Sequence, residues 1–199
     1  TNSVELAHRE SKIETEFTTQ LGVWLIDEPI MGWLSKVRGI GVRNSARLLK
    51  WFGYCESFDT VGKLWAYSGL APVDGKAVKR KKGVTLPYNL KIKTAMVGVI
   101  GDSLLKASGA YKTRAYDGYK ARIMARGCCD KPHTKNNKPD GTMCREHPGH
   151  AHRMAIRYMV KLFLSHYHLK TRTIMGLPVR EPFATENLGH TTIIEPFED

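Results

Sequence analysis

The sequence has few cysteines, few acidic residues in its middle and no long apolar run. Only 4 of its 199 residues are cysteines, which excludes a disulfide scaffold and favours a reducing, intracellular environment. No run of about 18 apolar residues occurs, so we expect no membrane-spanning helix, and no signal-peptide pattern is present. Hydrophobic residues make up 42% of the chain, enough for a core, which excludes wholesale disorder.

The charge is unevenly distributed along the chain. The formal net charge is +12, but residues 1–28 carry six acids and two bases, and residues 181–199 carry five acids and no Lys or Arg. Residues 29–180 therefore hold 29 bases against 8 acids, a net charge of +21. A central region this basic favours a polyanion such as nucleic acid as its partner, because each phosphate that a Lys or Arg neutralises releases counterions and so favours binding. A basic protein without such a ligand is the alternative, and a membrane surface is disfavoured.

Hydrophobic periodicity predicts a mostly α fold. We expect an N-terminal helix in residues 1–28, a DNA-binding domain in 29–126, a Cys/His loop in 127–149, and a long helix followed by an extended acidic tail in 150–199. The expected helices after the first cover residues 30–37, 43–52, 59–67, 89–106, 111–124 and 150–173. Residues 71–88, rich in Gly, Pro and bases, are expected to form a loop or β-ribbon.

Residues 34–53 have the pattern of a helix-hairpin-helix, a short helix and an amphipathic helix joined by Gly39-Ile40-Gly41. Two glycines permit a tight turn and close approach to another chain, and Ile40 is expected to anchor the hairpin in the core. The backbone N–H groups of Gly41, Val42 and Arg43 would then point outward at a helix N-terminus, an anion site suited to a DNA phosphate. The alternative is a structural turn. The nearby bases Arg38, Arg43 and Lys50 favour the phosphate site.

A second basic feature lies in residues 76–83, where Lys76, Lys79, Arg80, Lys81 and Lys82 are five bases within seven residues. This run suits a loop that binds the nucleic-acid backbone, although a solvated charge run or a targeting patch has the same composition. In combination with the hairpin, the run favours nucleic acid.

Residues 128–152 contain a cluster of cysteines and histidines. Thiolates and imidazoles suit Zn²⁺, and a structural site needs four of them. Cys144 and His147 form one close pair, and His133 with either Cys128 or Cys129 supplies the other. We expect a structural zinc to order this loop. His150 and His152 are expected to begin the long helix rather than to bind the metal.

Residues 34–105 resemble the C-terminal domain of insertion-sequence transposases with a DEDD tetrad, the bridge-RNA-guided family that includes the Piv invertases. The matching stretches, in the family's order, are Val37-Arg-Gly-Ile-Gly-Val42, Ala46-Arg-Leu-Leu49, Phe58, Leu64-Trp-Ala-Tyr-Ser-Gly-Leu-Ala-Pro72 and Lys79-Arg-Lys-Lys-Gly83. Residues 155–164 are similar to the family's final helix. The resemblance implies binding to DNA and a place in the cytoplasm or nucleoid.

The sequence departs from this family in its catalytic parts. The residues before the hairpin are too few for the family's RuvC-like nuclease domain. The family's nucleophilic serine lies a few residues after the Gly-Leu-x-Pro motif, whereas here Ser68 precedes Gly69-Leu-Ala-Pro72 and the next residues, Val73-Asp74-Gly75-Lys76, include no serine. The eight acids of residues 29–180 show no recognisable catalytic spacing. We therefore assign no catalytic residue.

Three functions remain open after these observations. The first is a sequence-tolerant protein that contacts the backbone of duplex or branched DNA, and its binding should weaken steeply with salt. The second is a recombinase fragment, which requires an exposed Ser68 near an acid. The third is a module that docks a protein within a recombination assembly. A homodimer through the long first and last helices also stays open.

Overall fold

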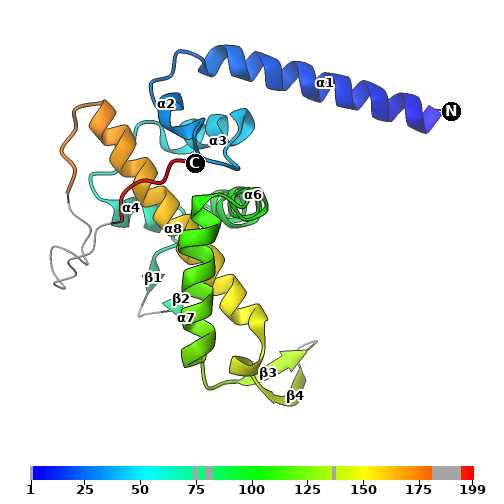
Figure 1. Ribbon diagram of the computed structural model, residues 1–199, viewed down its shortest axis with the longest axis vertical. Helices are drawn as coiled ribbons and strands as arrows, with labels where there is room; N and C mark the ends of the chain where they lie inside the picture. Colours follow the sequence, from blue (N-terminus) through cyan, green and yellow to red (C-terminus); the bar gives the residue numbers. More distant parts are fainter. Residues whose placement is uncertain (1, 74–75, 79–82, 136–137, 181–193) are drawn as a thin grey trace.

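The computed structural model describes residues 2–73, 76–78, 83–135, 138–180 and 194–199. It is mostly helical, as the sequence predicts, with two small two-stranded sheets (Figure 1). The first half contains α1 (Asn2–Leu25), α2 (Met31–Leu34), α3 (Val42–Phe52), α4 (Val61–Tyr67), β1 (Pro72–Val73) and β2 (Lys76–Ala77). The second half contains α5 (Leu90–Ala95), η1 (Met96–Ile100), α6 (Gly101–Ala107), η2 (Tyr111–Asp117), α7 (Gly118–Arg126), β3 (Pro132–Lys135), β4 (Lys138–Met143), η3 (Cys144–Glu146) and α8 (Pro148–Ile174).

The long helix α8 is the centre of the fold, because η2, α4, α6 and α7 all pack against it (Figure 1). Its buried side chains include Ala155, Met159 and Phe163, and the Phe163 ring stacks on Trp33 with centroids 5.8 Å apart. One hydrophobic core combines residues from segments 29–126 and 150–199. These two segments of the chain are therefore held together by shared apolar burial.

Two of the expected helices contain π-helical turns. The helix expected at 89–106 is α5, η1 and α6 in succession, and η1 is a π-helix of five residues. The helix expected at 111–124 begins with the seven-residue π-helix η2 and continues as α7. Buried side chains of both π-segments, such as Met96 and Tyr111, enter the common core. Extra residues in a turn reposition side chains, and periodicity in the sequence does not show such insertions.

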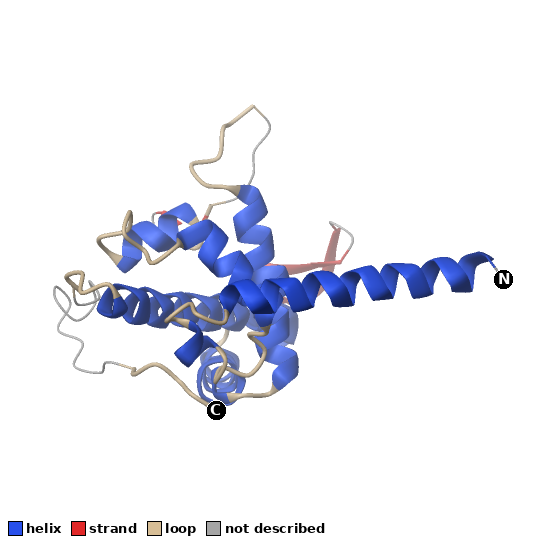
Figure 2. Cartoon of the chain, turned by 90° about the horizontal axis from the view of Figure 1, so that it is seen from above, coloured by secondary structure: helices blue, strands red, loops and turns tan. Residues whose placement is uncertain are grey.

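Helix α1 extends away from the remainder of the protein (Figures 1 and 2). Its contacts with the rest of the chain are mainly with α3, so its large apolar side chains stay exposed, among them Leu6, Ile13, Phe17 and Trp24. Among the described helices, α1 included, none combines the length and the apolarity needed to cross a bilayer.

The last described segment, residues 194–199, has no regular secondary structure and packs against the start of the domain. Phe197 is buried against Tyr111, and the indole Nε1 of Trp33 donates a 3.1 Å hydrogen bond to the Phe197 carbonyl. Glu198 forms ion pairs with Lys36 at 3.0 Å and Lys170 at 3.5 Å. This part of the expected acidic tail is therefore attached to the basic body.

Candidate nucleic-acid interface and metal centre

The hairpin between α2 and α3 depends on Gly39. Its φ of +92° lies in a region that L side chains rarely adopt, and a Cβ placed there would lie 2.6 Å from the Ser103 carbonyl oxygen. Ile40 is buried, as expected for the residue that anchors the turn in the core. The close contact with α6 accounts for one glycine of the pair on structural grounds alone.

Gly41, the second glycine, is at the exposed N-terminus of α3. It is the N-cap residue with extended backbone, no side chain caps the helix, and no atom lies within 4 Å of a Cβ built on it. The backbone N–H groups of Gly41, Val42 and Arg43 have no hydrogen-bond acceptor among the described residues. Open N–H groups at the positive end of an 11-residue helix are the elements of an anion site.

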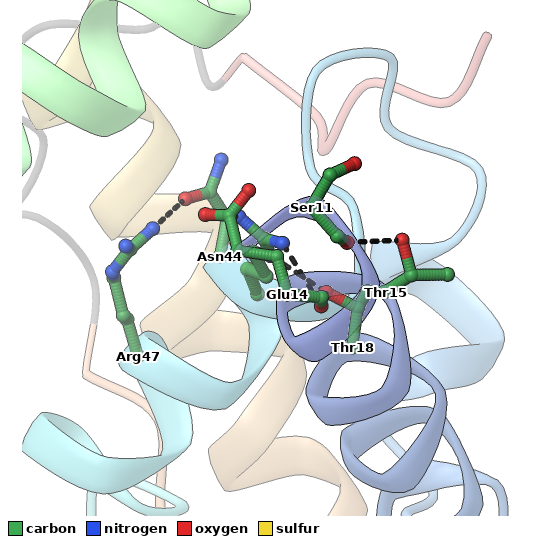
Figure 3. Close-up of polar contacts among 7 residues, drawn as sticks. Ser11, Glu14, Thr15, Thr18, Asn44 and Arg47 are labelled. Atoms are coloured by element: carbon green, nitrogen blue, oxygen red, sulfur yellow. Dashed lines mark hydrogen bonds and ion pairs between the residues drawn. The ribbon is translucent and has the colours of Figure 1, made fainter. Parts of the chain in front are cut away.

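Of the basic side chains expected beside the hairpin, Arg43 has partners within the protein. The Arg43 guanidinium donates to Thr18 Oγ1 at 2.7 Å and to Glu14 Oε1 at 3.1 Å, both on α1. Figure 3 shows Glu14 and Thr18 beside Asn44, together with the hydrogen bond that Arg47 donates to Asn44. Arg43 therefore connects α1 to α3, which the sequence did not indicate.

A carboxylate of the C-terminal segment contacts the other side of the hairpin. The backbone N–H of Arg38 donates to Asp199 Oδ2 at 3.1 Å, and the N–H of Ala110 donates to Asp199 Oδ1 at 2.6 Å. The Arg38 residue itself is exposed. Of the expected hairpin contacts, the N–H groups from Gly41 to Arg43 and the Arg38 side chain are thus the ones open to a ligand.

The basic run lies mostly outside the described residues. Lys79, Arg80, Lys81 and Lys82 are among the residues that the structure does not describe, and only the backbone of Lys76 is described, in β2. Strand β2 pairs antiparallel with β1, Val73 opposite Lys76. The expected β-ribbon is therefore present at its base.

Ser68 is fully buried, and its hydroxyl donates a 2.7 Å hydrogen bond to the Leu64 carbonyl. This is the ordinary bond that a serine makes within a helix. A hydroxyl without access to solvent cannot attack a phosphodiester. The requirement set for a recombinase with Ser68 as nucleophile is therefore not met.

Three thiols and one imidazole converge where α7 ends and α8 begins. Cys128, Cys129, Cys144 and His150 each offer a ligand atom, and these atoms all lie within 4.8 Å of one another. The Cys128 and Cys144 sulfurs are 3.7 Å apart, and His150 Nδ1 is 3.3 Å from the Cys144 sulfur and 3.5 Å from that of Cys129. All four cysteines of the chain are free thiols. This cluster has the number and type of ligands to hold a metal ion.

The backbone brings these four residues together from three elements. Cys128 and Cys129 follow the end of α7, Cys144 begins the short helix η3, and His150 is in the first turn of α8. The Cys144 N–H donates to the Lys131 carbonyl at 2.8 Å, which joins the two ends of the β3–β4 hairpin. Burial and the neighbouring thiols raise the pKa of Cys144 to about 12, so a cation must displace its proton to bind there.

The expected ligand set needs a correction in its histidines. His133 and His147 form a separate group with Asp140, in which the two imidazole rings stack with centroids 3.7 Å apart. His133 pairs with Asp140 at 2.6 Å, and His147 Nε2 lies 2.7 Å from Thr142 Oγ1. His150, expected only to begin α8, also joins the thiol cluster. Both Cys128 and Cys129 belong to that cluster, where the sequence left the choice between them open.

The signal for His150 was present but indirect. Pro148 occupies the first turn of α8, a position that proline favours, and it places the helix start two residues before His150. A side chain in a first turn points back toward the preceding loop.

Comparisons of the chain with protein-family models, with curated proteins and with solved structures find no match.

Proposed function

We propose that this protein binds DNA through the phosphate backbone, with little dependence on sequence, and that its hairpin domain is related to the C-terminal domains of the DEDD transposases. The observation that carries the proposal is the exposed, uncapped first turn of α3 at Gly41. Its open N–H groups suit a phosphate, and the +21 charge of residues 29–180 supplies a favourable field. Contacts of this kind position a duplex without reading bases.

The proposal is one of binding rather than catalysis. Ser68 is buried, and the sequence has no serine in the residues directly after Pro72, where the family has its nucleophile. Docking of a protein partner is the alternative, and retention of the isolated protein on DNA separates the two. A homodimer through the long first and last helices is a further expectation; α8 is packed at the centre of the fold, so the exposed apolar side chains of α1 are the face that remains for it, and light scattering of the purified protein tests it.

Gly41→Asp is the sharpest test of the hairpin, because it separates folding from binding. An aspartate at an N-cap accepts N–H groups of the first turn and stabilises a helix, so the variant should unfold at the same temperature as the wild type or higher. The same carboxylate occupies the proposed site and repels phosphate. We expect affinity for a 20-base-pair duplex, measured by fluorescence anisotropy, to fall about tenfold or more.

Gly41→Asn is the matched control, since it caps the helix without a charge. It should lose less affinity than Gly41→Asp. Wild-type affinity in a stable Gly41→Asp variant would show that the first turn of α3 does not contact DNA. The series should include single-stranded and four-way-junction DNA, with the salt concentration varied, because a shallow salt dependence would also count against phosphate binding.

We further propose that the Cys128, Cys129, Cys144 and His150 cluster binds a structural Zn²⁺. A tetrahedral zinc with bonds of about 2.3 Å to sulfur and about 2.0 Å to nitrogen separates two sulfurs by ~3.8 Å and a sulfur from a nitrogen by ~3.5 Å. The separations of 3.7 Å, 3.5 Å and 3.3 Å are close to these values. When bound, the ion would join α7 to α8 and order the β3–β4 hairpin between them.

Elemental analysis of the purified protein should find one zinc per chain. Cys144→Ser should abolish binding of Co²⁺, which is followed by its thiolate charge-transfer absorbance. Cys55→Ala is the matched control, because Cys55 is buried in the core away from the cluster, and it should bind Co²⁺ as the wild type does. A protein purified without metal that takes up no Co²⁺ would refute the site.

A further inference from the structure

Helix α8 contains an unusual row of cations. Its 27 residues include five Lys or Arg and no Asp or Glu. Three of the bases, Arg153, Arg157 and Lys161, are spaced four residues apart and so lie along one side of the helix. Arg153 is exposed, whereas Arg157 and Lys161 are half-buried. Neither the hairpin nor the metal cluster includes these three residues.

Aromatic side chains flank the two half-buried cations. Lys161 Nζ lies 3.9 Å from the centroid of the Trp65 ring, and Trp65 Nε1 donates a 3.1 Å hydrogen bond to the Lys161 carbonyl. The charge of Tyr88 raises the pKa of Arg157, against the larger effect of burial. A third cation, Lys93, lies 4.4 Å from the centroid of the Tyr88 ring and donates to its hydroxyl at 2.9 Å. The rings of Trp65 and Tyr88 make the surroundings of these cations weakly polar, and a weakly polar environment strengthens the attraction between a cation and an anion.

Arg157 and Lys161 have no carboxylate partner among the described residues. None of the ion pairs or side-chain hydrogen bonds found there includes either side chain. Burial lowers the pKa of Arg157, and burial together with the charge of Arg157 lowers the pKa of Lys161. Half-buried cations usually have a partner, because removing a charge from water is costly. Two like charges one helical turn apart add repulsion to that cost.

We infer that Arg157 and Lys161 form a phosphate-binding site, with Arg153 beside them, and that its ligand is the phosphodiester backbone of a nucleic-acid strand. The site lies on different elements from the Gly41 hairpin and deepens the proposed function by adding a second contact with the same ligand. A phosphate oxygen can accept from both side chains and neutralise their mutual repulsion. The positive charge retained on this face is thus explained by an external anion.

The test compares two double variants that each remove two positive charges. In Arg157→Met/Lys161→Met the methionines keep the apolar stems of the side chains. The control, Lys106→Met/Arg126→Met, removes two exposed bases from α6 and α7. Binding of duplex DNA is measured at several salt concentrations. The first variant should reduce the slope of log affinity against log salt by about 1 to 2, and the control should change it less.

Thermal unfolding in phosphate, without DNA, separates the α8 site from the hairpin when the variants of each site are compared. We expect 50 mM phosphate, compared with chloride at equal ionic strength, to raise the melting temperature of the wild type by about 3 °C. Because both proposed sites can take phosphate, most but not all of the rise should be lost in Arg157→Met/Lys161→Met, and the part contributed by the α8 site should persist in Gly41→Asp. In chloride alone, removing the two repelling cations should leave the melting temperature unchanged or raise it.

Three other outcomes would overturn the inference. Equal salt slopes in the two double variants would mean that net charge alone matters. Phosphate stabilisation without an effect on the slope would mean a site for a small anion rather than a strand. A fall in melting temperature of more than about 5 °C in chloride, repeated in the single variant Lys161→Met, would mean that the cations serve packing. If Gly41→Asp binds DNA normally while Arg157→Met/Lys161→Met does not, the hairpin contact fails and the α8 site stands.

Discussion

Gly39→Ala provides a direct measure of how the hairpin is built. The new methyl group would lie 2.6 Å from the carbonyl oxygen and 2.8 Å from the carbonyl carbon of Ser103, at a φ of +92°. Backbone strain at positive φ costs about 1–2 kcal/mol, and inserting a methyl group into a packed contact costs about 1–3 kcal/mol more. We therefore expect the free energy of unfolding to fall by about 2–5 kcal/mol.

Gly41→Ala is the matched control, two residues away in the same turn. Gly41 has a φ of −84°, and a methyl group added to it would have no neighbouring atom within 4 Å. Its substitution should change the free energy of unfolding by less than about 1 kcal/mol. The two glycines of one motif would thus differ severalfold in their effect on stability.

Urea unfolding, followed by tryptophan fluorescence and by circular dichroism at 222 nm, measures both variants on one scale. Trimming the Ser103 side chain should not rescue Gly39→Ala, because the atoms in its way belong to the backbone. Equal and small effects of the two substitutions would refute the argument, since they would mean that the hairpin does not pack against α6 as described.

Three further predictions concern the metal cluster, a buried histidine and Ser68. His133→Asn/His147→Asn should retain one equivalent of metal, measured by elemental analysis, because the imidazoles of these residues contact Asp140 and Thr142 and not the thiol cluster; loss of metal would place them among the ligands. Burial lowers the pKa of His166 from 6.5 to about 4. Between these two pH values His166 is protonated in the unfolded chain but neutral in the folded chain. The free energy of unfolding should therefore fall by on the order of 3 kcal/mol as the pH is lowered from 6.5 to 4. His166→Gln should flatten that pH profile, and an unchanged profile would assign the loss to other groups. Ser68→Ala should cost about 1 kcal/mol in urea unfolding and leave DNA affinity unchanged, whereas a loss of DNA affinity in the folded variant would contradict the structural role.

Much of the architecture was predictable because it depends on local rules. Apolar periodicity predicts most of the helices, and α4 begins with a local cap, in which the Thr60 side chain accepts the N–H of Lys63. The Gly-Ile-Gly turn predicts a hairpin with a buried isoleucine, and Ile40 is buried. The thiols of Cys128, Cys129 and Cys144 do meet. Each of these inferences needs only residues that are close in the sequence.

The differences all depend on contacts between distant segments. The sequence predicts that Arg43 contacts DNA, whereas in the structure its guanidinium donates to Glu14 and Thr18 of α1. His133 and His147 are suitable ligands by spacing, but the β3–β4 pairing places them beside Asp140 and leaves the fourth position in the thiol cluster to His150. The π-helical turns of η1 and η2 likewise arise within a packed core.

The sequence by itself determined a mostly helical chain, a hairpin with two glycines, a group of metal-binding residue types, and a basic body between acidic ends. These properties follow from residue chemistry and short-range spacing. Only the tertiary structure decided which glycine is required for packing, which histidine joins the thiols, that Ser68 is buried, and that Arg157 and Lys161 lie half-buried together. The physical reason is that burial, pairing and desolvation belong to the environment of a side chain, and that environment exists only once α8 has packed against the rest of the fold.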